Sequence, residues 1–308
     1  MRALVLGGNG FIGSHLVDQL VLSGWEVVVL DLIERRYEPA PDAVHLLQGD
    51  LTQSYLLREA LLGVDVVFHL AWTTVHETSN QDPAADALAN LIPSIRLLED
   101  CLRSGIRRVV FTSSGGTVYG QVRATPTPET HPQNPMSGYG ITKLAVEHYL
   151  QMFGHLYGLD YSILRPSVPY GPRQNPLGSQ GAAAVFLYRV ARNLPVTIWG
   201  SGNVSRDFFF VTDLVDALLR AATAELSLHR VFNIGGAEVV TLNELLRRVE
   251  LLLGRRAEVQ YRPARSFDAD RVHLDTSLAR MELGWQPRVP LEEGLRRTAA
   301  WMASQLPA

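Results

Sequence analysis

The sequence predicts an α/β fold, with a doubly wound parallel sheet and a smaller, threaded C-terminal α/β lobe. Short apolar runs alternate with amphipathic stretches through the first half of the chain. A glycine-rich turn separates the first apolar run from the first amphipathic stretch, and the regular alternation ends near residue 166. Continuous apolar strands that alternate with helices are typical of a parallel sheet covered on both faces.

The first half of the chain contains six apolar runs of the length expected for buried strands. They are Ala3–Leu6, Val27–Leu30, Val44–Leu47, Val64–His69, Val109–Thr112 and Tyr161–Leu164. Between Phe11 and Ser23 apolar residues recur at helical spacing, and Gly24 follows as a typical helix end. Longer helices are predicted over about 84–104 and 137–157, which places helices between most of the strands.

After residue 166 the strand pattern weakens. Residues 169–181 are rich in turn-forming types and predict a loop. Thr241 and Glu244 have the spacing of a helix-start capping box. Val231–Ile234 has the composition of a strand that returns to the main sheet. Helices are predicted at 183–193, 212–223, 241–253 and 291–303. We expect a dinucleotide-binding unit of residues 1–168 with about 205–237, and a second lobe of residues 169–204 with 238–308.

Composition excludes several classes of protein. The net charge of −3 gives no reason to expect nucleic acid or an anionic membrane as a partner. No apolar run approaches the roughly 20 residues of a membrane helix, and Met1 leads straight into a strand pattern, which leaves no room for a signal peptide. Cys101 is the only cysteine, so we expect a core residue and a cytoplasmic protein without an internal disulfide. The nine histidines lack metal-ligand spacing, so no metal is expected.

Gly7, Gly10 and Gly13 form a turn between the first strand and the first helix. The first glycine permits a tight turn, the second lets a phosphate approach the backbone, and the third lets helix and strand pack closely. The helix that starts near Phe11 directs free N–H groups and its positive end at that phosphate. The turn therefore predicts a site for the pyrophosphate of a dinucleotide.

Two carboxylates follow the next two strands. Asp31 lies about 20 residues beyond the turn, where a carboxylate can accept hydrogen bonds from the adenosine ribose and repel a 2′-phosphate. Asp31 therefore favours NAD over NADP, while Arg35 and Arg36 lie close enough to keep NADP open. Asp50 can contact the adenine amine, and it can also cap the helix expected to begin at Gln53.

Tyr139 and Lys143 are four residues apart, so they share one face of the helix predicted over 137–157. A free tyrosine titrates near 10, but a lysine ammonium and the positive nicotinamide ring nearby would favour the phenolate. Tyr139 can then remove a hydroxyl proton while the nicotinamide takes the hydride. Ser113 and Ser114 follow the fifth strand, and either can orient the substrate oxygen.

These residues carry a family resemblance that spans nearly the whole chain. The chain resembles the extended short-chain dehydrogenase/reductase family, in its nucleotide-sugar epimerase/dehydratase branch. Beyond the motifs above, the resemblance includes His69–Ala71, Asn90, Leu164–Pro166, Tyr170–Pro172, Gly200 with Gly202, Arg206 with Asp207, Phe232–Gly235, Arg265 with Asp268, and Leu283–Trp285. It implies a Rossmann domain that binds NAD and a lobe that binds a UDP-sugar.

The resemblance also implies residue roles. Ser114 matches the hydroxyl residue that hydrogen-bonds the reacting sugar oxygen, beside the catalytic Tyr139 and Lys143. Arg206 and Arg265 match arginines that clamp the nucleotide diphosphate, and Asp268 matches a carboxylate at the nucleotide end. The NAD-binding residues implied are Gly7, Gly10, Phe11, Ile12, Gly13, Asp31, Asp50, Leu51, Leu70, Ala71, Tyr139 and Lys143. The substrate-binding residues implied are Ser114, Tyr139, Arg206, Arg265 and Asp268.

The lack of acidic residues directly after Ser114 favours one reaction within the family. Dehydratases of this branch generally carry acidic residues directly after the catalytic hydroxyl residue, and decarboxylating relatives keep a Glu there, whereas this chain has Gly115–Thr117. The resemblance thus favours a UDP-sugar 4-epimerase similar to the UDP-glucose enzymes. The alternatives are a nucleotide-sugar reductase or dehydratase, and a non-catalytic sensor of dinucleotide or sugar nucleotide.

Two departures from the family pattern leave the sugar open, and the family implies an assembly. Val168 stands where relatives commonly have an Asn that contacts the substrate, and the bulky Trp72 stands in a stretch that is usually smaller. A hexose, an N-acetylhexosamine and a hexuronate therefore all remain candidates. The resemblance also implies a homodimer formed through the helices around 84–104 and 137–157.

Overall fold

A parallel sheet forms the centre of the molecule. The computed structural model describes residues 1–34, 37, 44–178 and 180–305, so Arg35 and Arg36 lie outside the described residues. The strands of the sheet are β1 (Arg2–Leu6), β2 (Glu26–Asp31), β3 (Val44–Gln48), β4 (Val66–His69), β5 (Arg108–Thr112), β6 (Asp160–Pro166) and β11 (Arg230–Ile234). Within the described residues their order is β11-β6-β5-β4-β1-β2-β3. The six predicted strands are confirmed, and so is the return of the chain to the sheet at β11.

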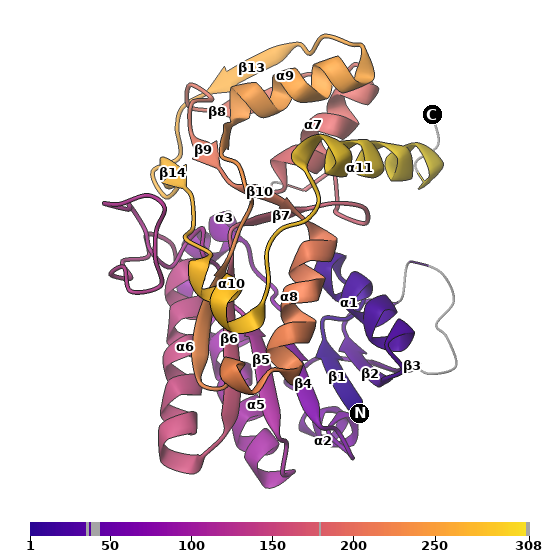
Figure 1. Cartoon of the computed structure of the whole chain (residues 1–308), viewed down its shortest axis with the longest axis vertical. Coiled ribbons are helices and arrows are strands. Elements are labelled where there is room, and N and C mark those ends of the chain that lie inside the picture. The colour runs from indigo at the N-terminus through magenta and orange to yellow at the C-terminus, as the bar shows by residue number, and fades with distance from the viewer. Residues whose placement is uncertain (35–36, 38–43, 179, 306–308) are drawn as a thin grey trace.

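Helices cover both faces of this sheet (Figure 1). One face packs against α1 (Phe11–Leu22), α8 (Val211–Thr223) and α10 (Ser277–Leu283). The other face packs against α2 (Ser54–Ala60), α5 (Ile92–Arg103) and α6 (Gly138–Tyr157). Cys101 is fully buried in that second layer, and burial raises the pKa of its thiol. The prediction of Cys101 as a core residue is confirmed.

The order of the strands reverses at the centre of the sheet. Leu6 of β1 pairs with Leu30 of β2 on one side and with His69 of β4 on the other. Because parallel strands point the same way, the turns after β1, β2 and β4 all open at one edge of the sheet. Ligands of doubly wound sheets bind in the crevice at such a reversal. The predicted fold class is confirmed by this topology.

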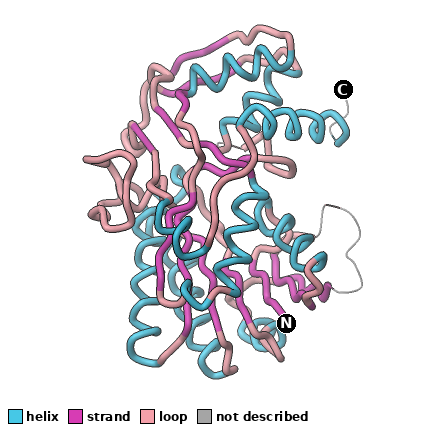
Figure 2. The backbone as a smooth tube through the Cα atoms, viewed as in Figure 1, coloured by secondary structure: helices cyan, strands magenta, loops and turns pink. Residues whose placement is uncertain are grey.

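A second lobe lies beyond the carboxyl ends of the main strands (Figure 2). Its strands pair as β7 (Val168–Tyr170) with β10 (Phe208–Phe210), β8 (Val196–Trp199) with β13 (Val259–Arg262), and β9 (Ser205–Arg206) with β12 (Val240–Thr241) and β14 (Arg271–Val272). Its helices are α7 (Ala182–Ala191), α9 (Leu242–Leu253) and α11 (Leu291–Gln305), and a short helix η2 (Glu225–Ser227) precedes β11. The helices were predicted, and the side chain of Thr241 caps α9 by accepting from the Glu244 N–H. Most of the short strands were not predicted.

The segment after β4 is less regular than the single helix predicted over 84–104. It contains α3 (His76–Gln81), α4 (Pro83–Asp86), a π-helical turn η1 (Ala87–Leu91) and then α5. The irregularity has a polar cause, because Asn90 in the π-helical turn donates to the Asp86 carboxylate and accepts from the Thr73 N–H. No described helix is both long and apolar enough to span a bilayer.

Candidate active site

The glycine-rich turn after β1 leaves no room for side chains. Gly7 has φ +81°, and a Cβ there would lie 2.9 Å from the backbone of Ala71. A Cβ on Gly13 would lie 2.1 Å from the Gly7 carbonyl oxygen. Gly10 precedes α1 and provides no side-chain cap, so the first N–H groups of α1 stay available to an anion. The turn thus fits a pyrophosphate, and Leu70 and Ala71 after β4 form its far wall.

Asp31 at the end of β2 supports this turn. Its carboxylate accepts hydrogen bonds from the N–H groups of Asn9 at 2.8 Å and Ile33 at 3.1 Å. A carboxylate has about four lone-pair positions, so it can still accept from ribose hydroxyls. Asp31 therefore both braces the turn and presents an anion beside it.

Asp50 organises the turn after β3. Its carboxylate accepts from the Thr52 N–H at 2.7 Å, and its own N–H donates to the Gln53 side chain at 2.8 Å. Helix α2 begins at Ser54 with Gln53 as its N-cap residue, so the alternative reading of Asp50 as the cap is wrong. Leu51 packs against the core layer that contains α2.

The first turn of α6 positions Tyr139. The Ser137 side chain caps α6 by accepting from the Gly140 N–H at 3.2 Å. The Tyr139 N–H donates to the Ser79 hydroxyl of α3 at 2.8 Å. One face of the Tyr139 ring stacks on His76, with ring centroids 5.0 Å apart and planes inclined at 18°. Tyr139 is thus fixed from a second helix as well as from its own.

Lys143 lies one turn further along α6 and is almost completely buried. Its ammonium donates to the Thr112 carbonyl at the end of β5, at 2.8 Å. It also lies 3.7 Å from the centroid of the Trp72 ring, a cation–π geometry. The Trp72 ring meets Tyr139 edge to face at 5.9 Å. The structure therefore brings Tyr139 and Lys143 together, as predicted, with the Lys143 ammonium 5.7 Å from the Tyr139 ring centroid and Trp72 beside both.

Burial dominates the electrostatics of this pair. It raises the pKa of Tyr139, and the negative charge of Asp86 raises it further. Burial also lowers the pKa of Lys143 to about 7, against the opposing charges of Glu147 and Asp86. The lowering of the tyrosine pKa was predicted from Lys143 together with the nicotinamide charge, and in the chain alone desolvation raises this pKa instead.

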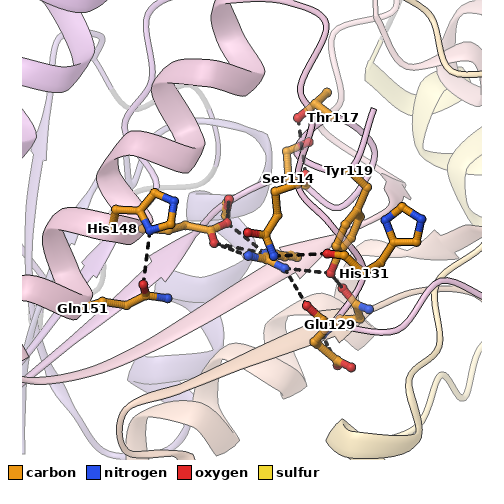
Figure 3. Close-up of polar contacts among 12 residues, drawn as sticks. Ser114, Thr117, Tyr119, Glu129, His131, His148 and Gln151 are labelled. Carbon is orange, nitrogen blue, oxygen red and sulfur yellow. Dashed lines mark hydrogen bonds and ion pairs between the residues drawn. The ribbon is translucent and has the colours of Figure 1, made fainter. Parts of the chain in front are cut away.

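The loop after β5 distinguishes the two serines that the sequence left open. The Ser113 hydroxyl donates to the Glu147 carboxylate and is thereby occupied. The Ser114 carbonyl accepts from the N–H groups of Thr117 and Val118, and no hydrogen bond ties its hydroxyl to another described residue (Figure 3). The geometry therefore favours Ser114 as the side chain available to a substrate. A Cβ on Gly115 would lie 2.8 Å from the Arg165 carbonyl oxygen, so this position cannot easily hold an acidic side chain.

A buried network holds this loop (Figure 3). Arg165 of β6 binds the Glu147 carboxylate through Nε and a terminal nitrogen, and both side chains are almost inaccessible. Arg165 also donates to the Tyr119 hydroxyl at 2.8 Å, which in turn donates to Asn233 at 2.7 Å. Removing one member would leave a buried charge unpaired, which is strongly destabilising. The network therefore fixes the serine loop against β6, β11 and α6.

Three of the predicted substrate residues, Arg206, Arg265 and Asp268, lie on the second lobe near His76 of α3. The Arg265 Nε donates to the Asp268 carboxylate at 3.0 Å, and its guanidinium lies 5.2 Å from the centroid of Trp199. Arg206 on β9 is mostly buried, which lowers the pKa of its guanidinium against the opposing charge of Asp268. The charges of all three residues act on the His76 ring, so the structure brings them together beside the stack on Tyr139.

Sequence reasoning missed His76 and Asp86. His76 stacks on Tyr139, and Asp86 is a fully buried carboxylate that accepts from Thr142 at 2.5 Å, from Thr74 and from Asn90. Asp86 and Asn90 are four residues apart in the helix predicted over 84–104 and so share one of its faces, a signal that could have found Asp86. Val168 forms part of β7 and packs against the apolar core of the second lobe, which explains an aliphatic residue there.

A surface cavity of about 410 Å³ lies away from this chemistry, between α1, α8 and the Arg288–Val289 segment. None of the predicted catalytic residues lines it. Helices α1 and α8 cover the face of the sheet opposite α6, so the cavity is separate from Tyr139.

Comparison with known proteins places the chain in a family. The family described as NAD dependent epimerase/dehydratase matches residues 3–235. The chain belongs to this family. Membership confirms both the resemblance found in the sequence and the predicted dependence on NAD. It also agrees with the cradle formed by Gly7 and Gly13.

Several members of the family are similar over the full chain. A UDP-glucose 4-epimerase from Mycolicibacterium smegmatis is 39% identical over 312 residues, covering 99% of each protein. The UDP-glucose 4-epimerase of Thermotoga maritima, solved with UDP-glucose, is 38% identical with a TM-score of 0.94 and 100% coverage of both chains. The Thermus thermophilus UDP-glucose 4-epimerase in complex with NAD is 37% identical with a TM-score of 0.92, covering 99% of this chain and 100% of that one.

Proposed function

We propose that this chain is an NAD-dependent 4-epimerase of a UDP-hexose. The observation that carries the proposal is the free hydroxyl of Ser114, at the same sheet edge as Tyr139 and Lys143 and in a loop without an acidic residue. The full-length similarity to UDP-glucose 4-epimerases supports the substrate class. The same residues support oxidation of a sugar hydroxyl followed by its reduction.

Tyr139 is the proton-transfer group in this proposal. When bound, oxidised NAD supplies the hydride acceptor and a positive charge beside the phenol. Tyr139 takes the proton from the sugar hydroxyl at C4, and Ser114 hydrogen-bonds the same oxygen. After the 4-keto sugar has turned to present its other face, Tyr139 returns the proton. The Thr112 carbonyl and the Trp72 ring hold the Lys143 amino group beside the site.

The surroundings of Ser114 disfavour a dehydratase. Elimination of water needs a base for the proton at C5, and Gly115–Thr117 offers no carboxylate. Two buried carboxylates of the surrounding helices are occupied, since Glu147 binds Arg165 and Ser113, and Asp86 accepts from Thr74, Thr142 and Asn90. Neither is therefore available as the missing base.

The second lobe supports a site for the nucleotide end of the substrate. In this proposal Arg206 and Arg265 bind the diphosphate, and Asp268 orients Arg265 from 3.0 Å. The division into residues 1–168 with about 205–237, and 169–204 with 238–308, is part of the same proposal. Two observations support it: β11 and α8 lie on the main sheet, and α7, α9 and α11 share a separate core. Three short elements cross the proposed bounds, since β9 and β10 pair within the second lobe and α10 packs on the main sheet.

The proposal is tested by incubation with UDP-glucose in the absence of added NADH, followed by product analysis by NMR. We expect UDP-galactose to form with no net change in NADH absorbance. Tyr139→Phe should lower kcat by about 10²- to 10⁴-fold, because the proton-transfer group is lost. The proposal is wrong if no epimer forms from UDP-glucose, UDP-N-acetylglucosamine or UDP-glucuronate. Stoichiometric NAD(P)H consumption would identify a reductase, and a 4-keto-6-deoxy product would identify a dehydratase.

The homodimer and the cytoplasmic location also remain proposals. Apolar side chains are exposed along the helices predicted to form the dimer, and they are Leu88, Ile92, Ile141, Met152 and Leu156. Exposed apolar surface on adjacent helices supports an interface. The single buried cysteine is compatible with a reducing compartment.

A further inference from the structure

Three aromatic rings connect the proposed catalytic base to the proposed diphosphate site. His76 stacks on Tyr139 at 5.0 Å and, on its other side, on Phe267 at 6.2 Å with planes inclined at 24°. Phe267 lies in the turn that carries Arg265 and Asp268, and the Arg265 guanidinium is 5.5 Å from its ring. The stack therefore passes from α6 through α3 to the second lobe.

His76 is held rigidly relative to Tyr139. The Ser79 hydroxyl of α3 donates to the His76 carbonyl at 3.0 Å and accepts from the Tyr139 N–H at 2.8 Å. The Gly138 N–H donates to the Asn80 side chain at 2.8 Å, which ties the same two helices again. Backbone and ring contacts thus fix the plane of Tyr139 together.

The imidazole shields the phenol without adding charge to it. Burial lowers the pKa of His76, and although Asp268 opposes this, Arg265 and Arg206 add to it. The ring is therefore neutral at physiological pH, where it covers one face of Tyr139. The other charged groups that face Tyr139 are Lys143 on its own helix and Asp86 from α4.

We propose that His76 is a positioning residue for Tyr139, and that Phe267 couples it to the turn that binds the diphosphate. This inference rests on the proposed function. A catalytic group has to be held within about 0.5 Å of its productive position, and an error of about 1 Å can cost 10²-fold in rate. His76 stacked on one face of the ring and Trp72 in edge-to-face contact at 5.9 Å hold Tyr139 in one orientation.

The test compares His76→Ala with His76→Phe, which keeps a ring but removes both nitrogens. We expect His76→Ala to lower kcat by about 10- to 100-fold with KM for UDP-glucose within about twofold. His76→Phe should retain kcat within about threefold of wild type. His45→Ala is the matched control, because His45 is exposed on β3 at the edge of the main sheet and lies outside both the active site and the helices of the proposed dimer. It should match wild type.

Phe267 gives an independent variant if His76→Ala fails to fold. Phe267→Ala should also lower kcat. The kcat of the double variant His76→Ala/Phe267→Ala should equal that of His76→Ala within about twofold, because the two rings act as one unit. A rise in KM with unchanged kcat would overturn the proposal in favour of a sugar contact. Equal losses in His76→Ala and His76→Phe, or additive losses in the pair, would overturn stacking.

A pH titration that needs no substrate tests the role of His76 independently of the proposed function. Tyrosinate absorbance is titrated with pH, each protein being compared with the same protein carrying Tyr139→Phe. His76→Ala admits water to the ring and should lower the apparent pKa of Tyr139, whereas His76→Phe should not. No shift in His76→Ala would overturn the shielding. If wild type epimerises no UDP-hexose, the proposed function fails while this titration still decides the role of His76.

Discussion

Tyr139 and Lys143 share one buried carboxylate, Asp86, whose charge acts on both. Asp86 lies at the end of α4 and is held by Thr74, Thr142 and Asn90, with no cation among its hydrogen-bond partners in the described chain. A buried negative charge favours the protonated form of every neighbour. Tyr139 and Lys143 are therefore tuned by a carboxylate that is hydrogen-bonded to neither of them in the described chain.

Replacement of Asp86 tests this tuning. Asp86 raises the pKa of Tyr139 and of Lys143, so Asp86→Asn should lower both. The ionisations of Tyr139 and Lys143 together set the profile of kcat/KM against pH. The whole profile should therefore move to lower pH. A profile that keeps its position while thermal unfolding shows an intact fold would contradict the coupling.

Asp207 gives a pH dependence of stability rather than of rate. Burial raises its pKa to about 8, against a hydrogen bond from the Leu274 N–H at 3.0 Å. The folded state therefore holds a proton that the unfolded chain, titrating near 4, has already released. This contribution to stability is complete below about pH 4 and is lost as pH rises towards about 8. Urea unfolding between pH 5 and 8 should show a shallower loss in Asp207→Asn than in wild type, and equal slopes would refute this.

Among the elements, the turn between β1 and α1 is the one whose backbone has to fit the pyrophosphate of NAD. A Cβ on Gly13 would lie 2.1 Å from the Gly7 carbonyl oxygen, so Gly13→Ala has to displace the turn from the helix. We expect the purified variant to lose most of its bound NAD, measured by extraction and chromatography. Gly105→Ala is the control, because Gly105 has nothing within 4 Å of its Cβ position, although its positive φ makes the substitution strained. It should lose some stability and keep its NAD.

The elements that were predictable and those that were not differ physically. Strands β1 and β5 are continuous apolar runs, because both of their faces are buried, so the sequence reveals them directly. Strands β9, β12 and β14 have two residues each and exist only through pairing between distant segments. The π-helical turn at Asn90 depends on partners at Thr73 and Asp86, which no local pattern encodes.

The same limit applies to the candidate site. The sequence predicted Tyr139 and Lys143 from their spacing on a predicted helix, and only the family resemblance chose Ser114 over Ser113. It did not predict His76, because a histidine in a polar stretch resembles a solvated helix start. Only the tertiary structure shows that the first residue of α3 packs against Tyr139. It also shows that Phe267, from a turn about 190 residues later, stacks on the same histidine.

At the scale of the whole molecule, the main sheet and the second lobe are connected by several crossings of the chain. The chain leaves the sheet after β6, returns for α8 and β11, and leaves again. The segment around α10 then returns to pack against α8 and β11, where Trp285 donates to the Asp213 carbonyl at 2.8 Å. Because the lobes share so many connections, we expect them to unfold together.

The last prediction is that the protein is a homodimer. It is based on the exposed apolar surface of the helical layer formed by α5 and α6. On α6 the exposed Ile141, Met152 and Leu156 follow a helical stripe, and the π-helical turn presents Leu88 beside α6. Apolar side chains gathered on adjacent helices are typical of an interface. Light scattering of wild type should give twice the mass of one 34.1 kDa chain.

Substitution on this surface distinguishes an interface from incidental exposure. Ile141→Glu with Leu88→Glu places like charges where two copies would meet, and should give a monomer that still binds NAD. Leu251→Glu is the matched control, because Leu251 is equally exposed but lies on α9 in the other lobe. It should remain dimeric. A monomeric wild type, or dissociation caused equally by Leu251→Glu, would show that the helices around α6 do not form the contact. Since the π-helical turn that presents Leu88 also holds Asn90 and adjoins Asp86, loss of the dimer should lower kcat more than it raises KM.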